Sequence, residues 1–166
     1  MAINAGSFFD YPGEPLETPA ASAAAAAHQF MAGRNPGDWA TLYDYTVTRK
    51  FTPGELLVDP AYPEDTLYLI GEGNLEVLAQ SSTGHFVCVA EAGPGSIVGE
   101  IPFFTGTSTS RVQAVSAGGA AALTMERFEV LALHEPQLAR LLLVELGRLM
   151  AERLRQLETL AAGGTR

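Results

Sequence analysis

Hydrophobic positions in this chain follow one period near its two ends and another in its middle. Between residues 47 and 125, short runs rich in β-branched and aromatic residues alternate with turn residues such as those at 53–54 and 93–95. Strands this short and this closely spaced predict an antiparallel β-roll or jelly roll. The predicted strands are 47–51, 55–58, 67–70, 75–78, 85–90, 111–116 and 120–125.

Helical patterns flank the predicted strands. Thr18 and a following proline open an alanine-rich stretch that ends at Gly33, which predicts a helix over 19–32. A second helix is predicted over 39–45, with Asp38 as its cap, and helical spacing returns over 127–161. In the last helix, leucines and a methionine recur at three- and four-residue steps, the pattern of a buried stripe. The members of this stripe are Leu143, Leu146, Met150, Leu154 and Leu157.

These elements predict an α+β fold class. The expected domain, 18–166, is an antiparallel double-stranded β-roll over 47–125, jelly-roll-like, flanked by N-terminal and C-terminal helices. Residues 1–17 are rich in Gly, Pro and acids and cannot form a core of their own, although they carry an aromatic cluster at 8–11. We expect them to form a flexible N-terminal tail.

Composition narrows the classes of function. Ten basic residues against nineteen acidic ones give a formal net charge of −9, whereas binding to nucleic acid rests on clustered Lys and Arg. The densest basic segment, 148–155, is interleaved with Glu152 and is interpreted as a solvated helix face. We therefore expect no nucleic acid partner.

The chain has no membrane or secretion signature, and it contains a single cysteine. No apolar run is long enough to span a bilayer, and the N-terminus lacks a secretion signal, so no membrane insertion is expected. Cys88 excludes an intramolecular disulfide and suits a reducing compartment. We predict a cytoplasmic protein with a buried strand thiol at Cys88.

Catalytic and metal-binding signatures are missing from the sequence. The histidines, His28, His85 and His134, fall in three different predicted elements without ligand spacing, which argues against a metal site and against a metal-dependent enzyme on a roll. There is no nucleophile elbow, no Walker loop and no Cys–His pairing. The chain is predicted not to be an enzyme.

One segment has the features of an anion-binding site. Gly99 lets the backbone approach a ligand, and the residues after it can begin a helical turn whose N–H groups point at an anion. Glu100 offers carboxylate acceptors that suit a ribose 2′-hydroxyl, and an arginine would give a planar donor fork for phosphate oxygens. The first cation after Glu100 is Arg111.

Three ordered stretches resemble the cyclic-nucleotide-binding domain family, which includes Crp/Fnr-like proteins and protein kinase A regulatory subunits. The stretches are FTPGELL at 51–57, DTLYLIGEGNLEV at 65–77 and AGPGSIVGEIPFF at 92–104. The resemblance covers residues 38–160. It implies a cAMP or cGMP ligand, with no further cofactor, held beside Glu100 and closed in by the last helix.

The resemblance leaves the phosphate arginine open, because Ser108 and Thr109 stand where the family usually has Pro-Arg. In one register the loop is longer, Arg111 is the ligand arginine, and Val115 and Ala117 follow at the family's spacing. In the other, Thr109 replaces the arginine and the site has lost its charge. Val112 would follow the arginine without a hydroxyl to meet guanine, which favours cAMP. The predicted contacts are Val98, Gly99, Glu100, Ile101, Ser110, Arg111 and Val112.

Two functions remain open at this point. The first is a cyclic-nucleotide sensor, in which the ligand orders the cassette, pulls the C-terminal helices inward and signals through a protein partner or a homodimer formed by the C-terminal helix. The alternative is a nucleotide-independent adaptor or oligomerisation module on a degenerate form of the fold. No helix-turn-helix follows the last helix, so the chain is expected to act as a stand-alone module.

Overall fold

The computed structural model of the protein describes residues 30–31 and 34–163. The predicted tail, 1–17, lies outside the described residues, and so does nearly all of the predicted helix 19–32. Phe30 and Met31 form the start of the described chain, and both side chains are buried in the core.

The elements follow the predicted order of helix, strands and helices. They are α2 (Pro36–Asp44), β1 (Val47–Phe51), β2 (Leu56–Val58), β3 (Thr66–Glu72), β4 (Leu75–Gln80), β5 (Phe86–Ala92), β6 (Ile97–Val98), α3 (Glu100–Thr105), β7 (Ser110–Ala114), β8 (Gly118–Thr124), α4 (Met125–His134) and α5 (Pro136–Gly163).

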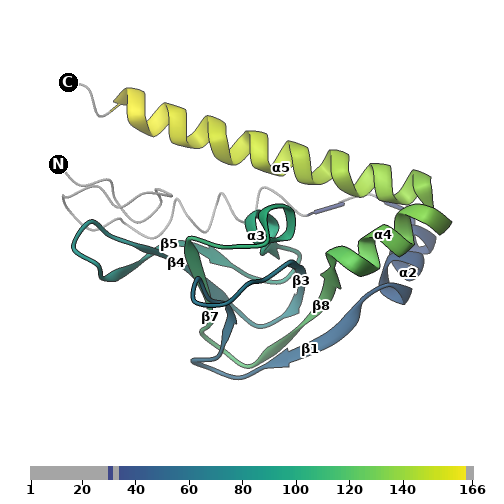
Figure 1. Ribbon diagram of the computed structural model, residues 1–166, viewed down its shortest axis with the longest axis horizontal. Helices are drawn as coiled ribbons and strands as arrows, with labels where there is room; N and C mark the ends of the chain where they lie inside the picture. The colour runs from purple at the N-terminus through teal and green to yellow at the C-terminus, as the bar shows by residue number, and fades with distance from the viewer. Residues whose placement is uncertain (1–29, 32–33, 164–166) are drawn as a thin grey trace.

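The strands form two antiparallel sheets of four strands each. One sheet has the order β1-β8-β3-β6 and the other has the order β2-β7-β4-β5. In Figure 1, α5 runs across the roll above α3, while α2 and α4 gather at one end. The predicted fold class, a β-roll with helices at both ends, is confirmed.

Strand β3 separates the two hydrophobic clusters of the protein. Successive side chains of a strand point to opposite faces, so Tyr68 and Ile70 enter the inner cluster between the sheets. Leu67 and Leu69 enter the outer cluster, where the helices pack on the first sheet. Both faces of β3 are covered, which explains why its sequence is an unbroken apolar run rather than an alternating one.

Helix α2 begins earlier than predicted. Its N-cap is Asn35, whose side chain accepts a hydrogen bond from the N–H of Asp38 at 3.0 Å, and Pro36 occupies the first turn. The prediction took Asp38 as the cap, but Asp38 is an acid inside the first turn, where it is favourable near the positive end of the helix dipole.

The buried face of α5 differs from the predicted stripe. The predicted Leu146 is buried, but its companions Leu143, Met150 and Leu154 are 41%, 39% and 57% exposed. The residues that pack on the outer cluster are Leu138, Ala139, Leu142 and Leu146. The stripe prediction was therefore wrong for three of its members, because apolar residues at three- and four-residue steps follow two faces of this helix.

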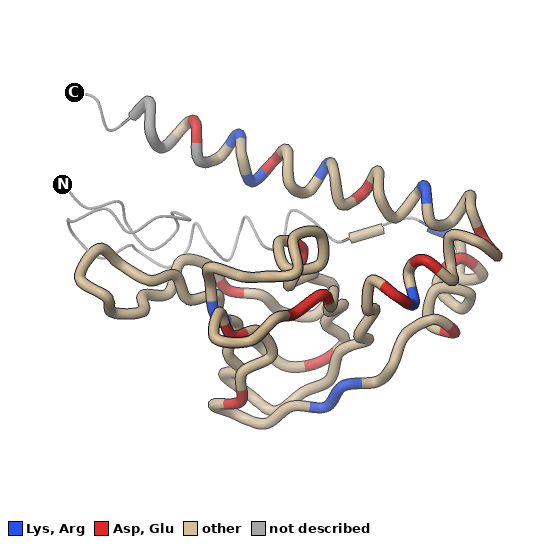
Figure 2. Tube along the Cα trace, in the orientation of Figure 1, with Lys and Arg blue, Asp and Glu red and all other residues tan. Residues whose placement is uncertain are grey.

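Two whole-chain expectations can be compared with the described residues. Within residues 30–31 and 34–163, no helix is long and apolar enough to cross a membrane. The same residues contain no group of three or more His, Cys, Asp or Glu side chains that could hold a metal ion. Figure 2 shows basic and acidic residues interleaved along α5.

Candidate ligand-binding cassette

The second residue of the cassette, which spans residues 98–112, occupies a position that only glycine fits. Gly99 precedes α3 with a φ of 86°, and a Cβ added there would lie 2.4 Å from the carbonyl oxygen of Thr66. Both the dihedral angle and the close approach exclude a side chain. This geometry holds the start of α3 against β3, with Val98 inside the roll and Glu100 at the first position of the helix.

Glu100 is the buried acid of the cassette, and its partner comes from α5. Its carboxylate forms an ion pair with the guanidinium of Arg153. Arg153 Nη2 also donates a hydrogen bond to the carbonyl oxygen of Ile97 at 3.3 Å. Burial lowers the pKa of Arg153 to about 10, so Arg153 remains charged at neutral pH. The last helix is thereby tied to the carboxylate predicted to bind a sugar.

The interpretation of segment 148–155 as a solvated helix face is wrong for Arg153. Arg153 follows the buried Leu146 by seven residues and the half-buried Leu149 by four, and residues at this spacing share one face of a helix. Arg153 thus lies on the face of α5 that packs on the roll. The spacing of Arg153 from Leu146 and Leu149 is visible in the sequence and could have predicted its inward position. Using it, however, requires knowing which row of leucines is buried.

The remaining residues of α3 divide between core and surface. Phe103 is buried and makes edge-to-face contacts with Phe104 and Phe128. Ile101 and Phe104 are exposed. Of the predicted contacts in this half of the cassette, Val98 and Glu100 therefore face the protein interior, whereas Ile101 points toward solvent.

Strand β7 carries the second half of the cassette, and its alternation decides which side chains face inward. Val112 and Ala114 belong to the inner cluster between the sheets. Ser110 lies on the same face as these two residues, because side chains two apart in a strand share a face. The inward positions of β7 thus offer one hydroxyl and no charge.

Arg111 lies on the outer face of its sheet. Its guanidinium carbon lies 4.0 Å from the centroid of the Phe86 ring, and its Nε lies 3.5 Å from Oδ1 of Asp59. The ring face and the carboxylate both attract the cation. Arg111 and Glu100 therefore have different partners: Asp59 and Phe86 for Arg111, and Arg153 for Glu100.

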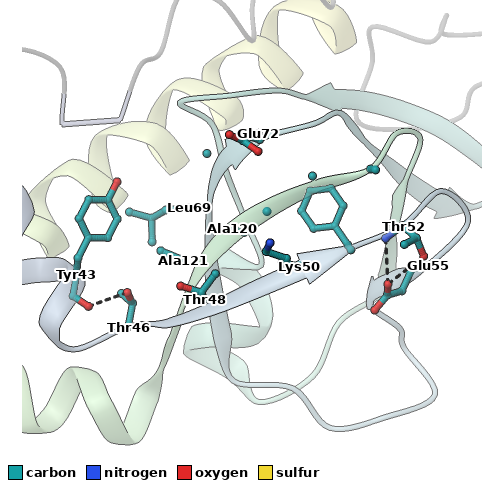
Figure 3. A pocket seen from close by; sticks show the side chains of 15 residues that line it. Tyr43, Thr46, Thr48, Lys50, Thr52, Glu55, Leu69, Glu72, Ala120 and Ala121 are labelled. Carbon is teal, nitrogen blue, oxygen red and sulfur yellow. Dashed lines mark hydrogen bonds between the residues drawn. The ribbon is translucent and has the colours of Figure 1, made fainter.

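A separate groove lies on the outer face of the first sheet and contains none of the predicted cassette residues. Its volume is about 890 Å³, and its lining includes Tyr43, Thr48, Lys50 and Glu72 above a floor of small residues from β8. Figure 3 shows Tyr43 at one end of the groove and Thr52 near the other.

The family model of the cyclic nucleotide-binding domain matches residues 48–135, which is more than half of the 166 residues. The chain belongs to the cyclic nucleotide-binding domain family. The match covers the roll, the cassette and α4, and it confirms the resemblance found in the sequence. Domains of this family are usually regulatory modules. Among curated proteins, no match is found.

Solved structures of cyclic nucleotide-binding domains share this fold. A domain from Methylobacillus flagellatus is 21% identical, with a TM-score of 0.72, covering 82% of this chain and 77% of that one. The catabolite activator protein of Thermus thermophilus is 24% identical, with a TM-score of 0.65, covering 81% of this chain and 63% of that one.

Another similar structure is the regulatory subunit of a cAMP-independent protein kinase A from Trypanosoma cruzi, bound to guanosine. It is 26% identical to this cyclic nucleotide-binding domain, with a TM-score of 0.54, covering 70% of this chain and 45% of that one. The structural relatives thus include both Crp/Fnr-type regulators and kinase regulatory subunits.

Proposed function

We propose that this chain is a regulatory sensor module in which a ribose-containing ligand binds beside Glu100, and in which α5 passes the state of the site to a protein partner. The observation that carries the proposal is the buried position of Glu100 at the start of α3, with Gly99 holding it against β3. A carboxylate in this position can accept hydrogen bonds from sugar hydroxyls. Val98, Ser110 and Val112 face the same interior and are the proposed companions of Glu100.

The ligand is proposed to be recognised mainly through its nucleoside part. A charged phosphate needs a cation or several donors close by, but the inward positions of β7 are a serine and two apolar residues, and Arg111 pairs with Asp59 on the outside. The cation beside Glu100, Arg153, is already paired with that carboxylate. The guanosine bound to the Trypanosoma cruzi regulatory subunit, a nucleoside without a phosphate, supports this proposal. Cyclic AMP and adenosine should therefore bind this chain with similar affinity.

Two further statements are part of the same proposal. Because the buried Val112 has no hydroxyl to meet guanine, adenine is expected to be preferred over guanine. The chain is proposed to have no catalytic activity, no nucleic acid partner and a cytoplasmic location, in keeping with its regulatory family, its net charge of −9 and its single cysteine.

Calorimetric titration of the full chain with adenosine, guanosine, cAMP and cGMP tests the proposal. Replacing Glu100 with Gln removes the charge with little change of shape, and it should weaken binding of the preferred ligand roughly tenfold, because hydrogen bonds to an ionised acceptor are the stronger ones. The control is Glu126→Gln, at an exposed acid in the first turn of α4, which should leave binding unchanged. Absence of heat with all four compounds, in folded protein, would exclude the sensor function.

A nucleotide-independent adaptor is the second candidate, and the surface of α5 favours it. Leu143, Met150 and Leu154 form an exposed apolar row along this helix, beside the row that packs on the core. Exposed apolar rows of this spacing are typical of helix pairing. If the chain is an adaptor, Leu154→Glu should shift a dimer to a monomer in size-exclusion chromatography with light scattering, whether or not nucleotide is present.

A further inference from the structure

The contact between α5 and the cassette covers the carboxylate that the ligand needs. The Glu100 side chain is 9% exposed and the Arg153 side chain 25% exposed, with the two groups in direct contact. A ligand approaching from solvent therefore meets the guanidinium before it reaches the acid. Glu100 lies within the fold's expected sugar site, but that site is occupied by a side chain of the protein itself.

A guanidinium and a ribose use the same feature of Glu100. Both donate hydrogen bonds to the carboxylate lone pairs, and the charged donor forms the stronger bond. A neutral sugar therefore has to displace Arg153 and leave its charge to find other partners. Displacement also removes the hydrogen bond from Arg153 to the carbonyl of Ile97, so the ion pair and this hydrogen bond are lost together.

The two halves of α5 are attached to the protein in different ways. Its first half packs apolar side chains, including Leu142 and Leu146, into the outer cluster. Further along, Arg153 contacts the roll through polar groups, whereas Met150 and Leu154 are exposed. Apolar packing is not affected by a ligand at Glu100, but the polar contacts are. Loss of the Arg153 contacts would loosen the second half of α5 and leave the first half in place.

We propose that Arg153 competes with the ligand for Glu100, so that ligand entry releases the second half of α5 from the roll. This rests on the proposed function and gives it a direction opposite to the inward movement predicted from the sequence. Coupling between two binding events is reciprocal. Weakening the contact of Arg153 therefore strengthens ligand binding, and ligand binding weakens the attachment of α5.

The test uses the full chain and two variants of α5, with adenosine and cAMP as probes. Arg153→Gln removes the charge and shortens the side chain, while it keeps an amide group that can still donate hydrogen bonds. Arg155→Gln is the matched control, since Arg155 is exposed on the same helix. Calorimetry measures ligand affinity, and hydrogen exchange of the amides in 150–160 measures the attachment of α5. Circular dichroism establishes that each variant is folded.

Arg153→Gln should bind the preferred probe about tenfold more tightly than the unmodified chain, a typical size for coupling between sites. Arg155→Gln should bind as the unmodified chain does. Saturating ligand should speed exchange in 150–160 without affecting the amides of 138–146. Should Arg153→Gln fail to fold, Arg153→Lys, with a weaker single-point contact, should show a smaller gain in affinity in the same direction.

Two results would overturn the competition, and they can be told apart. Weaker binding by Arg153→Gln, or slower exchange in 150–160 with ligand, would mean that Arg153 contacts the ligand and that α5 closes over it; the sensor function would then stand. No binding by the unmodified chain or by Arg153→Gln would overturn the sensor function and the competition together.

Discussion

The two halves of the cassette were set by different physical constraints, and only one of them is local. Gly99 and Glu100 occupy their positions because of one backbone angle and one close approach to Thr66. Arg111 occupies its position because β7 pairs with β4 in a particular register, with Arg111 opposite Leu78 and Val112 opposite Val77. A shift by one residue in a strand moves a side chain to the other face of the sheet. Motif spacing that crosses a loop into a strand is therefore far less informative than spacing within a turn.

The largest expected effect on stability comes from the first half of the cassette, where the Glu100–Arg153 ion pair lies. Arg153→Met should lower the free energy of unfolding by about 2–4 kcal/mol, because a buried carboxylate loses its partner. The double variant Glu100→Gln, Arg153→Met should be more stable than Arg153→Met alone, since no buried charge is left. Urea denaturation at pH 7 measures both values. Equal stabilities for the two variants would show that the unpaired Glu100 carboxylate carries no penalty in the fold.

Two glycines of positive φ test whether the close approach to Thr66 fixes the first half of the cassette. Gly99→Ala should cost about 3 kcal/mol, because the methyl group meets the Thr66 carbonyl in addition to the unfavourable angle. Gly106→Ala, at a φ of 75° but with open space around its Cβ, should cost only about 1 kcal/mol. Thermal or urea unfolding gives both costs. Similar costs at the two sites would mean that α3 shifts easily away from β3.

In the second half of the cassette, replacing Arg111 should have only a small effect on stability. Arg111→Met keeps much of the contact with Phe86 and removes a long, partly buried charge pair with Asp59, so the loss of stability should be about 1 kcal/mol. Affinity for adenosine or cAMP should be unchanged, because Arg111 lies outside the roll. A large loss of cAMP affinity with unchanged adenosine affinity would instead assign a phosphate to Arg111.

The smallest expected effect concerns Cys88, which shares a sheet face with Arg111 because both residues pair with Leu78. Cys88 is half-buried rather than fully buried as predicted, and this partial burial, reinforced by Glu76 and Glu91, raises the pKa of its thiol. At pH 8 a smaller fraction is therefore thiolate, and alkylation by iodoacetamide should be slower than for free cysteine. Bound ligand should leave the alkylation rate unchanged. Protection of Cys88 by cAMP would place the ligand on the outer face of the sheet.

Much of the fold could be predicted from the sequence because the period of the apolar residues changes at the ends of the roll. The strand from Val47 to Phe51 was predicted with its observed bounds, and the C-terminal helical region was predicted over 127–161, close to the observed 125–163. Strand β6, of two residues, was not predicted, since two residues show no period. Helix α4 begins at Met125 with Thr124 as its cap, earlier than the helical spacing alone indicated.

The site was less predictable than the fold, and Glu100 and Arg153 illustrate why. The place of Glu100 follows from the glycine before it, which is a local signal. The partner of Glu100 lies in another element, and its choice depends on which row of α5 faces the roll. Leu142 and Leu143 belong to different rows with the same spacing, yet only Leu142 is fully buried. Tertiary packing selects between such rows, and neighbours in sequence do not.

The outer cluster also determines how much of the chain must be present for the roll to fold. The family match spans 48–135, but Phe30 and Met31 enter this cluster from one side of that span, and Leu138, Leu142 and Leu146 enter it from the other. A fragment cut at the family boundaries would leave one sheet with a bare apolar surface and a tendency to aggregate. The cooperative unit of this protein therefore extends from Phe30 into α5, well beyond the part that defines its family.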